Sequence, residues 1–107
     1  MLSRLIDGGR RFLDQDSLVR NSGLFDQAWY ARTYPDAAQP GQELSHFLRV
    51  GARKGYNPGP RFSTNAYTTD YPDVREAGAN PLLHYLRFGR QEGRKIRDVE
   101  GLSLIHI

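Results

Sequence analysis

The sequence predicts an all-α protein made of two short helix-turn-helix repeats of about 37 residues, stacked behind an N-terminal capping helix. The first observation is internal similarity, because the segment that begins at Phe25 recurs from Phe62, 37 positions later. Such a period is typical of a supersecondary unit that stacks on its neighbour because it cannot bury its apolar face alone. The second observation is composition, since 107 residues with 38 % apolar and 25 % charged side chains suit one small domain with a modest core. We therefore divide the chain into a capping segment (1–23), two repeats (24–61 and 62–101) and a C-terminal peptide (102–107).

The capping segment is predicted from apolar residues at positions 2, 5 and 6 and again at 12 and 13, which favour one or two helices around a Gly8-Gly9 break. This segment lacks the unbroken apolar stretch of a secretory signal, and no window of the sequence approaches the length of a membrane span. We therefore expect a cytoplasmic protein. The absence of cysteine from the sequence excludes disulfides, thiolate zinc sites and cysteine nucleophiles.

Each repeat is predicted to begin with a short helix that has a capping residue before it and a proline after it. Asp26 and Ser63 occupy equivalent positions after a phenylalanine, and both side chains can accept a hydrogen bond from a helical N–H. Tyr34 and Tyr71 each precede a proline, which disfavours helical geometry for the residue before it. The first helix of each repeat should therefore end at these tyrosines.

The second helix of each repeat is predicted from apolar residues at helical spacing, which are Leu44, Phe47 and Leu48 in the first copy and Leu82, Tyr85 and Leu86 in the second. Asn80 followed by Pro81 is typical of an N-cap and a first helical residue. We expect Gly51 and Gly89 to end these helices, as glycine commonly does. Helices this short are marginal in water, so packing between them must stabilise them.

Aromatic residues and histidines that recur in both copies are predicted to be structural anchors. Aromatic rings at helical spacing are more often core residues than platforms for sugar rings. Two histidines at equivalent points of separate repeats are more often packed or hydrogen-bonded than metal ligands, and no nearby His or Cys cluster completes a zinc site. We therefore predict no metal and no cofactor. The anchors are Phe25, Trp29, Tyr30, Tyr34, His46, Phe62, Tyr67, Tyr71 and His84.

Three aspartates suggest acid–base chemistry, but each has a structural explanation. Asp26 is replaced by Ser63 in the second copy, a change that a cap tolerates and a catalytic carboxylate does not. Asp36 and Asp73 follow prolines and are expected to close the Pro-Asp turn or to cap the next segment. We therefore predict no catalytic residue within this chain.

The C-terminal peptide Leu102-Ser-Leu-Ile-His-Ile107 matches the translation of a transposon end that is used to build sequencing libraries. The alternative is a real strand with Leu102, Leu104 and His106 on one face. Agreement over the whole peptide favours a cloning or sequencing scar, so these residues take no part in the functional argument. We expect the chain to be the N-terminal fragment of a longer protein.

Three stretches between residues 24 and 96 carry a family resemblance: LFDQAWYARTYPD, ELSHFLRVGARKGYNPGPR and YPDVREAGANPLLHYLRFGRQEGR. They resemble helical repeats of the pattern FDxxWYxxxYPDV followed by NPLxHYLxxGxxEGR, which occur beside catalytic domains in bacterial glycosyltransferases and other polysaccharide-biosynthesis proteins. The first copy departs from the pattern at Ala37, at Pro40-Gly41 and at Lys54. The resemblance implies an accessory module that serves a downstream catalytic domain or another protein, and it places no sugar transfer within these residues.

Basic residues gather late in the second repeat, and the candidate contacts for a polyanion or an acidic partner are Arg87, Arg90, Arg94 and Lys95. Thirteen of the fifteen basic residues are arginine, and with twelve acidic residues the net charge is only +3, which does not by itself imply nucleic-acid binding. Arginine also binds sugar phosphates, acidic glycans and acidic protein surfaces through bidentate contacts. We expect a non-catalytic scaffold or interaction module, with polyanion or nucleic-acid binding as the alternative and catalysis ranked last.

Overall fold

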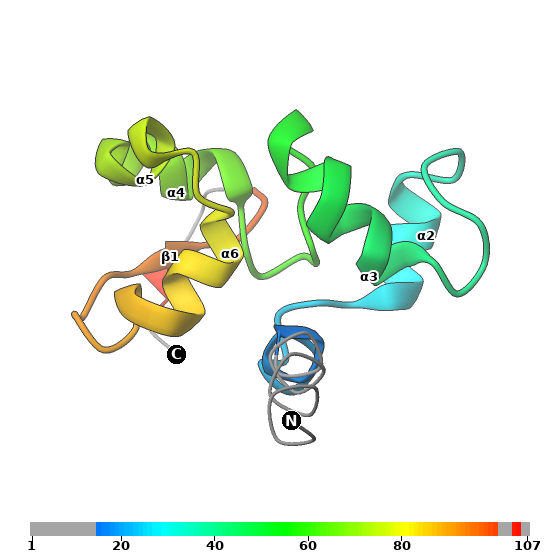
Figure 1. Ribbon diagram of the computed structural model, residues 1–107, viewed down its shortest axis with the longest axis horizontal. Helices are drawn as coiled ribbons and strands as arrows, with labels where there is room; N and C mark the ends of the chain where they lie inside the picture. The colour runs from blue at the N-terminus through cyan, green and yellow to red at the C-terminus, as the bar shows by residue number, and fades with distance from the viewer. Residues whose placement is uncertain (1–14, 101–103, 106–107) are drawn as a thin grey trace, which may run out of the picture.

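The computed structural model describes residues 15–100 and 104–105, and this part of the chain is mostly helical (Figure 1). Residues 15–21 are helical and precede α2 (Gln27–Thr33), α3 (Glu43–His46), η1 (Phe47–Gly51), η2 (Ala52–Lys54), α4 (Thr64–Asp70), α5 (Pro72–Ala77), α6 (Pro81–His84) and η3 (Tyr85–Gly89). Strands β1 (Ile96–Arg97) and β2 (Leu104–Ile105) follow. Figure 1 shows α2 and α3 on one side of the molecule and α4, α5, α6 and β1 on the other. We call residues 24–61 the first half and residues 62–100 the second half.

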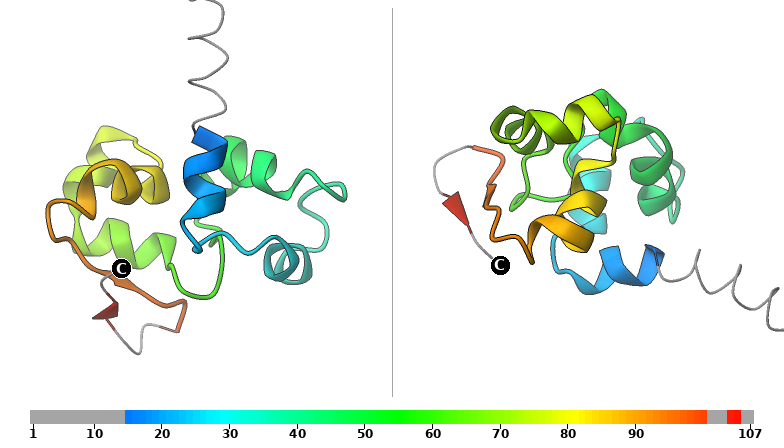
Figure 2. Two further views of the ribbon diagram at one scale, coloured as in Figure 1. Left: turned by 90° about the horizontal axis from the view of Figure 1, so that it is seen from below. Right: turned by 60° about the vertical axis from the view of Figure 1, so that its left-hand side comes forward.

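The helical residues 15–21 lie next to the junction of the two halves, as Figure 1 and the left view of Figure 2 show. Val19 and Leu24 are buried in the core. The Ser22 hydroxyl donates to the Val19 carbonyl oxygen at 2.6 Å and accepts from the Leu24 N–H at 3.0 Å, which turns the chain out of this helix. Most of the predicted capping helices, from residue 2 to residue 14, lie outside the described residues. None of the helices that the structure describes is long and apolar enough to cross a membrane.

The predicted caps and ends of the first helices are confirmed. The Asp26 carboxylate accepts a hydrogen bond from the Trp29 N–H at 3.0 Å, and the Ser63 hydroxyl accepts one from the Ala66 N–H at 3.1 Å. Tyr34 and Tyr71 are the residues at which α2 and α4 end. Because Asp and Ser satisfy the same exposed helical N–H, the two helices begin alike despite different capping residues.

Helix α6 also begins as predicted. The Asn80 side chain accepts from the Leu83 N–H at 3.2 Å, and Pro81 is the first helical residue. In the first half the equivalent helix α3 has Gln42 as its N-cap residue, and the Gln42 side chain makes no capping hydrogen bond. Both helices continue into a π-helical turn, η1 or η3.

The prediction that these helices end at Gly51 and Gly89 is confirmed, because these buried glycines are the last residues of η1 and η3. In the first half the short helix η2 follows and is capped by Gly55, whereas in the second half a turn leads to Gly93. Gly55 and Gly93 have φ angles of +83° and +81°. Only glycine adopts this left-handed geometry without steric cost, so glycine is required at these two positions as well.

The core is formed by aromatic rings and aliphatic side chains from both halves, and its fully buried aromatic residues are Tyr30, Phe47, Phe62, Tyr67 and Tyr85. The ring of Phe62, which precedes the cap of α4, lies 5.5 Å from that of Tyr67. Phe25 holds the same position before α2, with its ring 5.9 Å from that of Tyr30. These pairs resemble the contact across a helix start known as a hydrophobic staple. The other predicted anchors, Phe25, Trp29, Tyr34, His46, Tyr71 and His84, are half-buried.

The two halves differ most between their first and second helices. The second half has the helix α5 there, and its Val74 is buried against the core. The first half has turns at the same place, and the half-buried Ala37 stands where Val74 is. Pro40 explains part of this difference, because it has no N–H and disfavours helical geometry at the residue before it. The smaller Ala37 also provides less apolar surface to hold a helix against the core.

The pairing of β1 and β2 is a small departure from the all-α prediction. Ile96 pairs with Ile105 and Arg97 with Leu104 in antiparallel register. Strand β1 also closes the second half, because the Arg97 carbonyl oxygen accepts from the Ser63 N–H at 2.8 Å. The buried side chain of Ile96 fixes this extended segment against the core. β2 falls within the peptide that the sequence led us to set aside, and residues 102, 103, 106 and 107 lie outside the described residues.

Candidate functional site

The first candidate site is a hydrogen bond between a buried tyrosine and a histidine in the first half. The Tyr30 hydroxyl of α2 lies 2.6 Å from Nδ1 of His46 in α3. Burial raises the pKa of the Tyr30 hydroxyl well above its ordinary value, and the neighbouring Tyr34 and Tyr56 add to the shift. Gly51 lies one turn beyond His46, and a Cβ at that position would overlap the Tyr30 hydroxyl. The glycine therefore makes room for the hydrogen bond.

The second half contains the same arrangement. The Tyr67 hydroxyl of α4 lies 2.9 Å from Nδ1 of His84 in α6, and a Cβ at Gly89 would overlap that hydroxyl. Burial is the main cause that raises the pKa of the Tyr67 hydroxyl to about 12. The sequence predicted packed or hydrogen-bonded histidines but not the role of the glycines. The signal was present, since a glycine follows each histidine by five residues in the sequence.

A second pair of tyrosines closes each half. The Tyr34 hydroxyl accepts from the Asn57 N–H at 2.9 Å, and the Tyr71 hydroxyl accepts from the Lys95 N–H at 2.8 Å. The group that packs on the tyrosine ring differs between the two halves. The Tyr56 ring stacks on Tyr34 with centroids 4.1 Å apart and planes at 2°, whereas the Arg94 guanidinium lies 4.8 Å from the Tyr71 ring centroid. Aromatic stacking in the first half is thus matched by a cation–π contact in the second.

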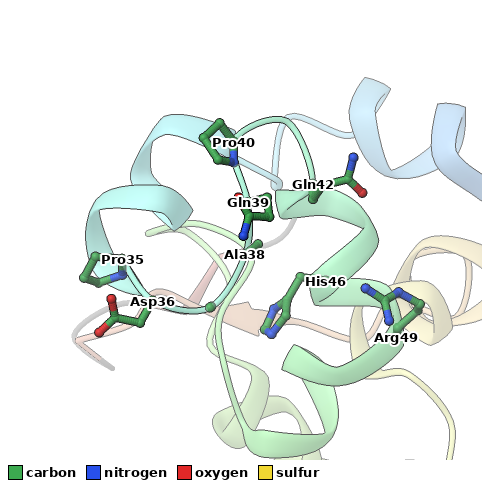
Figure 3. Close-up of a pocket in the computed structure, with 9 residues that line it drawn as sticks. Pro35, Asp36, Ala38, Gln39, Pro40, Gln42, His46 and Arg49 are labelled. Atoms are coloured by element: carbon green, nitrogen blue, oxygen red, sulfur yellow. The ribbon is translucent and has the colours of Figure 1, made fainter.

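A hollow of about 660 Å³ opens beside His46, between the loop that follows α2 and the helix formed by α3 and η1 (Figure 3). Figure 3 shows the His46 ring between Asp36 on the loop and Arg49 on the helix. A smaller hollow of about 390 Å³ adjoins it, shares Asp36 and His46, and is also lined by Lys54. The nine residues that line the larger hollow are Pro35, Asp36, Ala37, Ala38, Gln39, Pro40, Gln42, His46 and Arg49.

The charges around this hollow are not neutralised by neighbouring side chains. Among the residues that the structure describes, Asp36, Arg49 and Lys54 form no ion pair. Arg49 donates only from Nε, to the Ser45 hydroxyl at 3.2 Å. The pKa of His46 is lowered, first by burial and then by the positive charges of Arg49 and Lys54. His46 is therefore neutral at pH 7, with two cations near it.

Arg94, one of the predicted polyanion contacts, is bound to carboxylates of the chain itself. It donates to both carboxylate oxygens of Asp73, at 3.1 and 3.0 Å, and to Glu92 at 2.8 Å. The hydrogen bond from Arg94 lowers the pKa of the Asp73 carboxyl. Asp73 lies in the first turn of α5 rather than closing a turn. Arg87 and Lys95 are exposed, and Arg90 is half-buried.

The three aspartates that suggested acid–base chemistry have three different structural roles. Asp26 caps α2, Asp73 pairs with Arg94, and Asp36 lies exposed at the edge of the hollow. Within residues 15–100 and 104–105, no three His, Asp or Glu side chains are grouped as metal ligands would be. Asp36 lies with His46 in a common hollow. The sequence had marked the loop at Pro40-Gly41 as shortened but had not predicted the hollow.

No family model, curated protein or solved structure is significantly similar to the chain.

Proposed function

We propose that the chain is a non-catalytic helical-repeat scaffold or interaction module belonging to a bacterial glycosyltransferase or another polysaccharide-biosynthesis protein. The association with polysaccharide synthesis rests on the resemblance of residues 24–96 to repeats found beside such catalytic domains. The observation that carries the scaffold role is the tyrosine–histidine–glycine arrangement, which recurs in both halves with its histidine engaged by a buried tyrosine.

Further matched contacts support the proposal that the two halves are copies of one unit. The Gly51 carbonyl oxygen accepts from the Tyr56 N–H and the Gly89 carbonyl oxygen from the Arg94 N–H, both at 2.9 Å. These partners are 38 positions apart in the sequence, like the two histidines. A stack of copies buries a continuous core and leaves extended faces for partners, as other repeat proteins do.

The scaffold role is favoured over catalysis by what the chemical side chains do. His46 and His84 occupy equivalent places and bind equivalent tyrosines, whereas an active site needs an asymmetric set of nucleophile, base and orienting group. If one of the two histidines were catalytic, we would expect it to have a different hydrogen-bond partner from the other. Both instead contact a tyrosine hydroxyl.

Incubation of the chain with a panel of nucleotide-sugars tests this role. We expect neither transfer nor hydrolysis. Turnover that is abolished by His84→Ala, in a variant that still folds by circular dichroism, would replace the scaffold proposal with an enzyme. Sequencing the gene past Gly101 tests the association separately, because a nucleotide-sugar-binding domain there supports it and a stop codon contradicts it.

Polyanion binding is the second candidate, favoured by the one large apolar side chain that is exposed among the described residues. Phe88 is 55 % exposed and follows the exposed Arg87, so a ring and a cation lie together on η3. Nucleic-acid bases stack on such rings. Gel-shift titrations at two salt concentrations separate the candidates, because a steep salt-dependent shift that Arg87→Ala and Phe88→Ala both remove would favour a polyanion. The scaffold proposal expects no such shift.

A further inference from the structure

We propose that the hollow beside His46 binds a small hydroxylated anion, with its carboxylate or phosphate group against Arg49 and its hydroxyl groups toward Asp36. This site goes beyond the scaffold role and does not depend on it. It lies in the first half, where the loop of residues 35–42 replaces helix α5.

The loop gives the hollow its shape through its own hydrogen bonds. The Gln42 N–H donates to the Gln39 carbonyl oxygen at 2.9 Å, and the Gly41 N–H donates to the buried Glu43 carboxylate at 3.0 Å. Gly41 has a φ of +87°, which lets the chain turn back into α3. The resulting volume of about 660 Å³ falls within the range of small-molecule sites and exceeds what a bare inorganic ion fills.

Charge assigns the anionic end of the ligand. Arg49 lines the hollow, and Lys54 lines the adjoining one that shares His46 and Asp36 with it. The terminal nitrogens of Arg49 make no hydrogen bond within the described residues, since only Nε is engaged. Arginine binds carboxylate and phosphate oxygens in pairs, which favours an oxyanion over chloride.

His46 supplies a third donor. The Tyr30 hydroxyl lies 2.6 Å from Nδ1 of His46. With the hydroxyl as the donor of this hydrogen bond, the neutral ring carries its proton on Nε2. The ring lies in the hollow between loop and helix (Figure 3). Nε2–H is then available to an oxygen of the ligand.

The other polar groups that line the hollow select a ligand with hydroxyl groups. Asp36 accepts hydrogen bonds but repels a second anion, and it lies on the far side of His46 from Arg49 in Figure 3. The side chains of Gln39 and Gln42 offer both donors and acceptors. A molecule with an anionic group at one end and hydroxyls at the other, such as a sugar phosphate or a sugar acid, fits this polarity.

The second half offers a matched control because the same positions there do not form an anion site. Arg87 corresponds to Arg49, 38 positions later, and is exposed on η3. Glu92 stands where Lys54 does and pairs with Arg94, which reverses the charge. Arg87→Gln therefore removes the same charge from the chain as Arg49→Gln without touching the hollow.

The test is a titration of the whole chain, labelled with ¹⁵N, with glucose 6-phosphate, glucuronate, inorganic phosphate and glucose. We expect amide shifts confined to residues 35–56 with one or both sugar anions, and much weaker shifts with inorganic phosphate and with glucose. Response to glucose 6-phosphate alone would identify phosphate as the bound group, and response to both anions would identify a general oxyanion site.

Variants then locate the site. Arg49→Gln should weaken binding by about tenfold or more, Lys54→Gln should weaken it less, and Arg87→Gln should leave it unchanged. The proposal is overturned if neither sugar anion shifts these amides at 10 mM, if Arg87→Gln weakens binding as much as Arg49→Gln, or if glucose binds as well as its phosphate. Because Arg49 and Arg87 are exposed, both variants should keep the parent's amide spectrum, which verifies that they fold.

Discussion

The two halves of the molecule share a buried tyrosine–histidine hydrogen bond and differ in the segment that crosses beside it. In the second half, the helix α5 stands in this place, and its Asp73 binds Arg94 and interacts electrostatically with His84. In the first half, a loop replaces α5 and leaves the hollow beside His46. The comparison shows that the same internal hydrogen bond occurs beside two different segments, a helix in one half and a loop that lines a hollow in the other.

The largest expected effect comes from removing the buried tyrosines. Tyr30→Ala and Tyr67→Ala should each lower the free energy of unfolding by roughly 3 kcal/mol, because each removes a fully buried ring. Phe62→Ala should cost about as much, and Phe25→Ala less, since Phe25 is only half-buried. Urea melts measure all four. A cost for Phe25→Ala equal to that for Phe62→Ala would mean that the two halves are packed more alike than the structure indicates.

Double-mutant cycles between each buried glycine and the tyrosine that it faces test the arrangement that the two halves share. Gly89→Ala should destabilise by about 2 kcal/mol, because its Cβ overlaps the Tyr67 hydroxyl. In a Tyr67→Phe background the same change should cost much less, since the overlapping oxygen is gone. Gly51→Ala with Tyr30→Phe is the corresponding cycle in the first half. Additive costs in both cycles would show that the glycines are needed for another reason.

The identity of the capping residue should have only a small effect on stability. Asp26→Ala should cost about 1 kcal/mol and Asp26→Ser almost nothing, because serine caps the equivalent helix at Ser63. Denaturant melts of the two variants decide this point. Equal losses for both would show that Asp26 does something that a hydroxyl cannot.

The smallest expected effect is a dependence of stability on pH that originates in the first half. Because the pKa of His46 is lowered on folding, the unfolded chain binds more protons as the pH falls below about 6.5. The contribution of neutral His46 is therefore fully present above that pH and is lost as the pH falls. Melts between pH 8 and pH 5 should show declining stability with a shallower decline for His46→Gln. An unchanged slope in that variant would remove His46 as the cause.

The sequence predicted the parts of the fold that depend on local chemistry. The caps at Asp26, Ser63 and Asn80 and the helix ends before Pro35 and Pro72 each follow from one side chain or one backbone restriction. Burial of Tyr30, Phe62 and Tyr67 follows from their spacing.

What the sequence did not predict depends on contacts between distant residues. The need for glycine at positions 51 and 89 arises from a hydroxyl on another helix, and the pairing of Arg94 with Asp73 joins residues 21 positions apart. The hollow beside His46 exists because residues 35–40 form a loop where the second half has the helix α5. Neither Pro40 nor Ala37 alone predicts the loss of that helix. Loop shape of this kind is set by packing rather than by the local pattern.

The most direct test of the shared framework is the ¹⁵N spectrum of the imidazole side chains at pH 8. We use His106→Gln so that only His46 and His84 contribute. Each tyrosine hydroxyl lies within hydrogen-bond distance of Nδ1, and we expect it to donate there, so both histidines should show the pattern of a single tautomer protonated at Nε2. Tyr30→Phe should change the pattern of His46 alone, and Tyr67→Phe that of His84 alone. Rapid averaging of tautomers in either ring of the parent protein would contradict the claim that one hydrogen bond organises both halves.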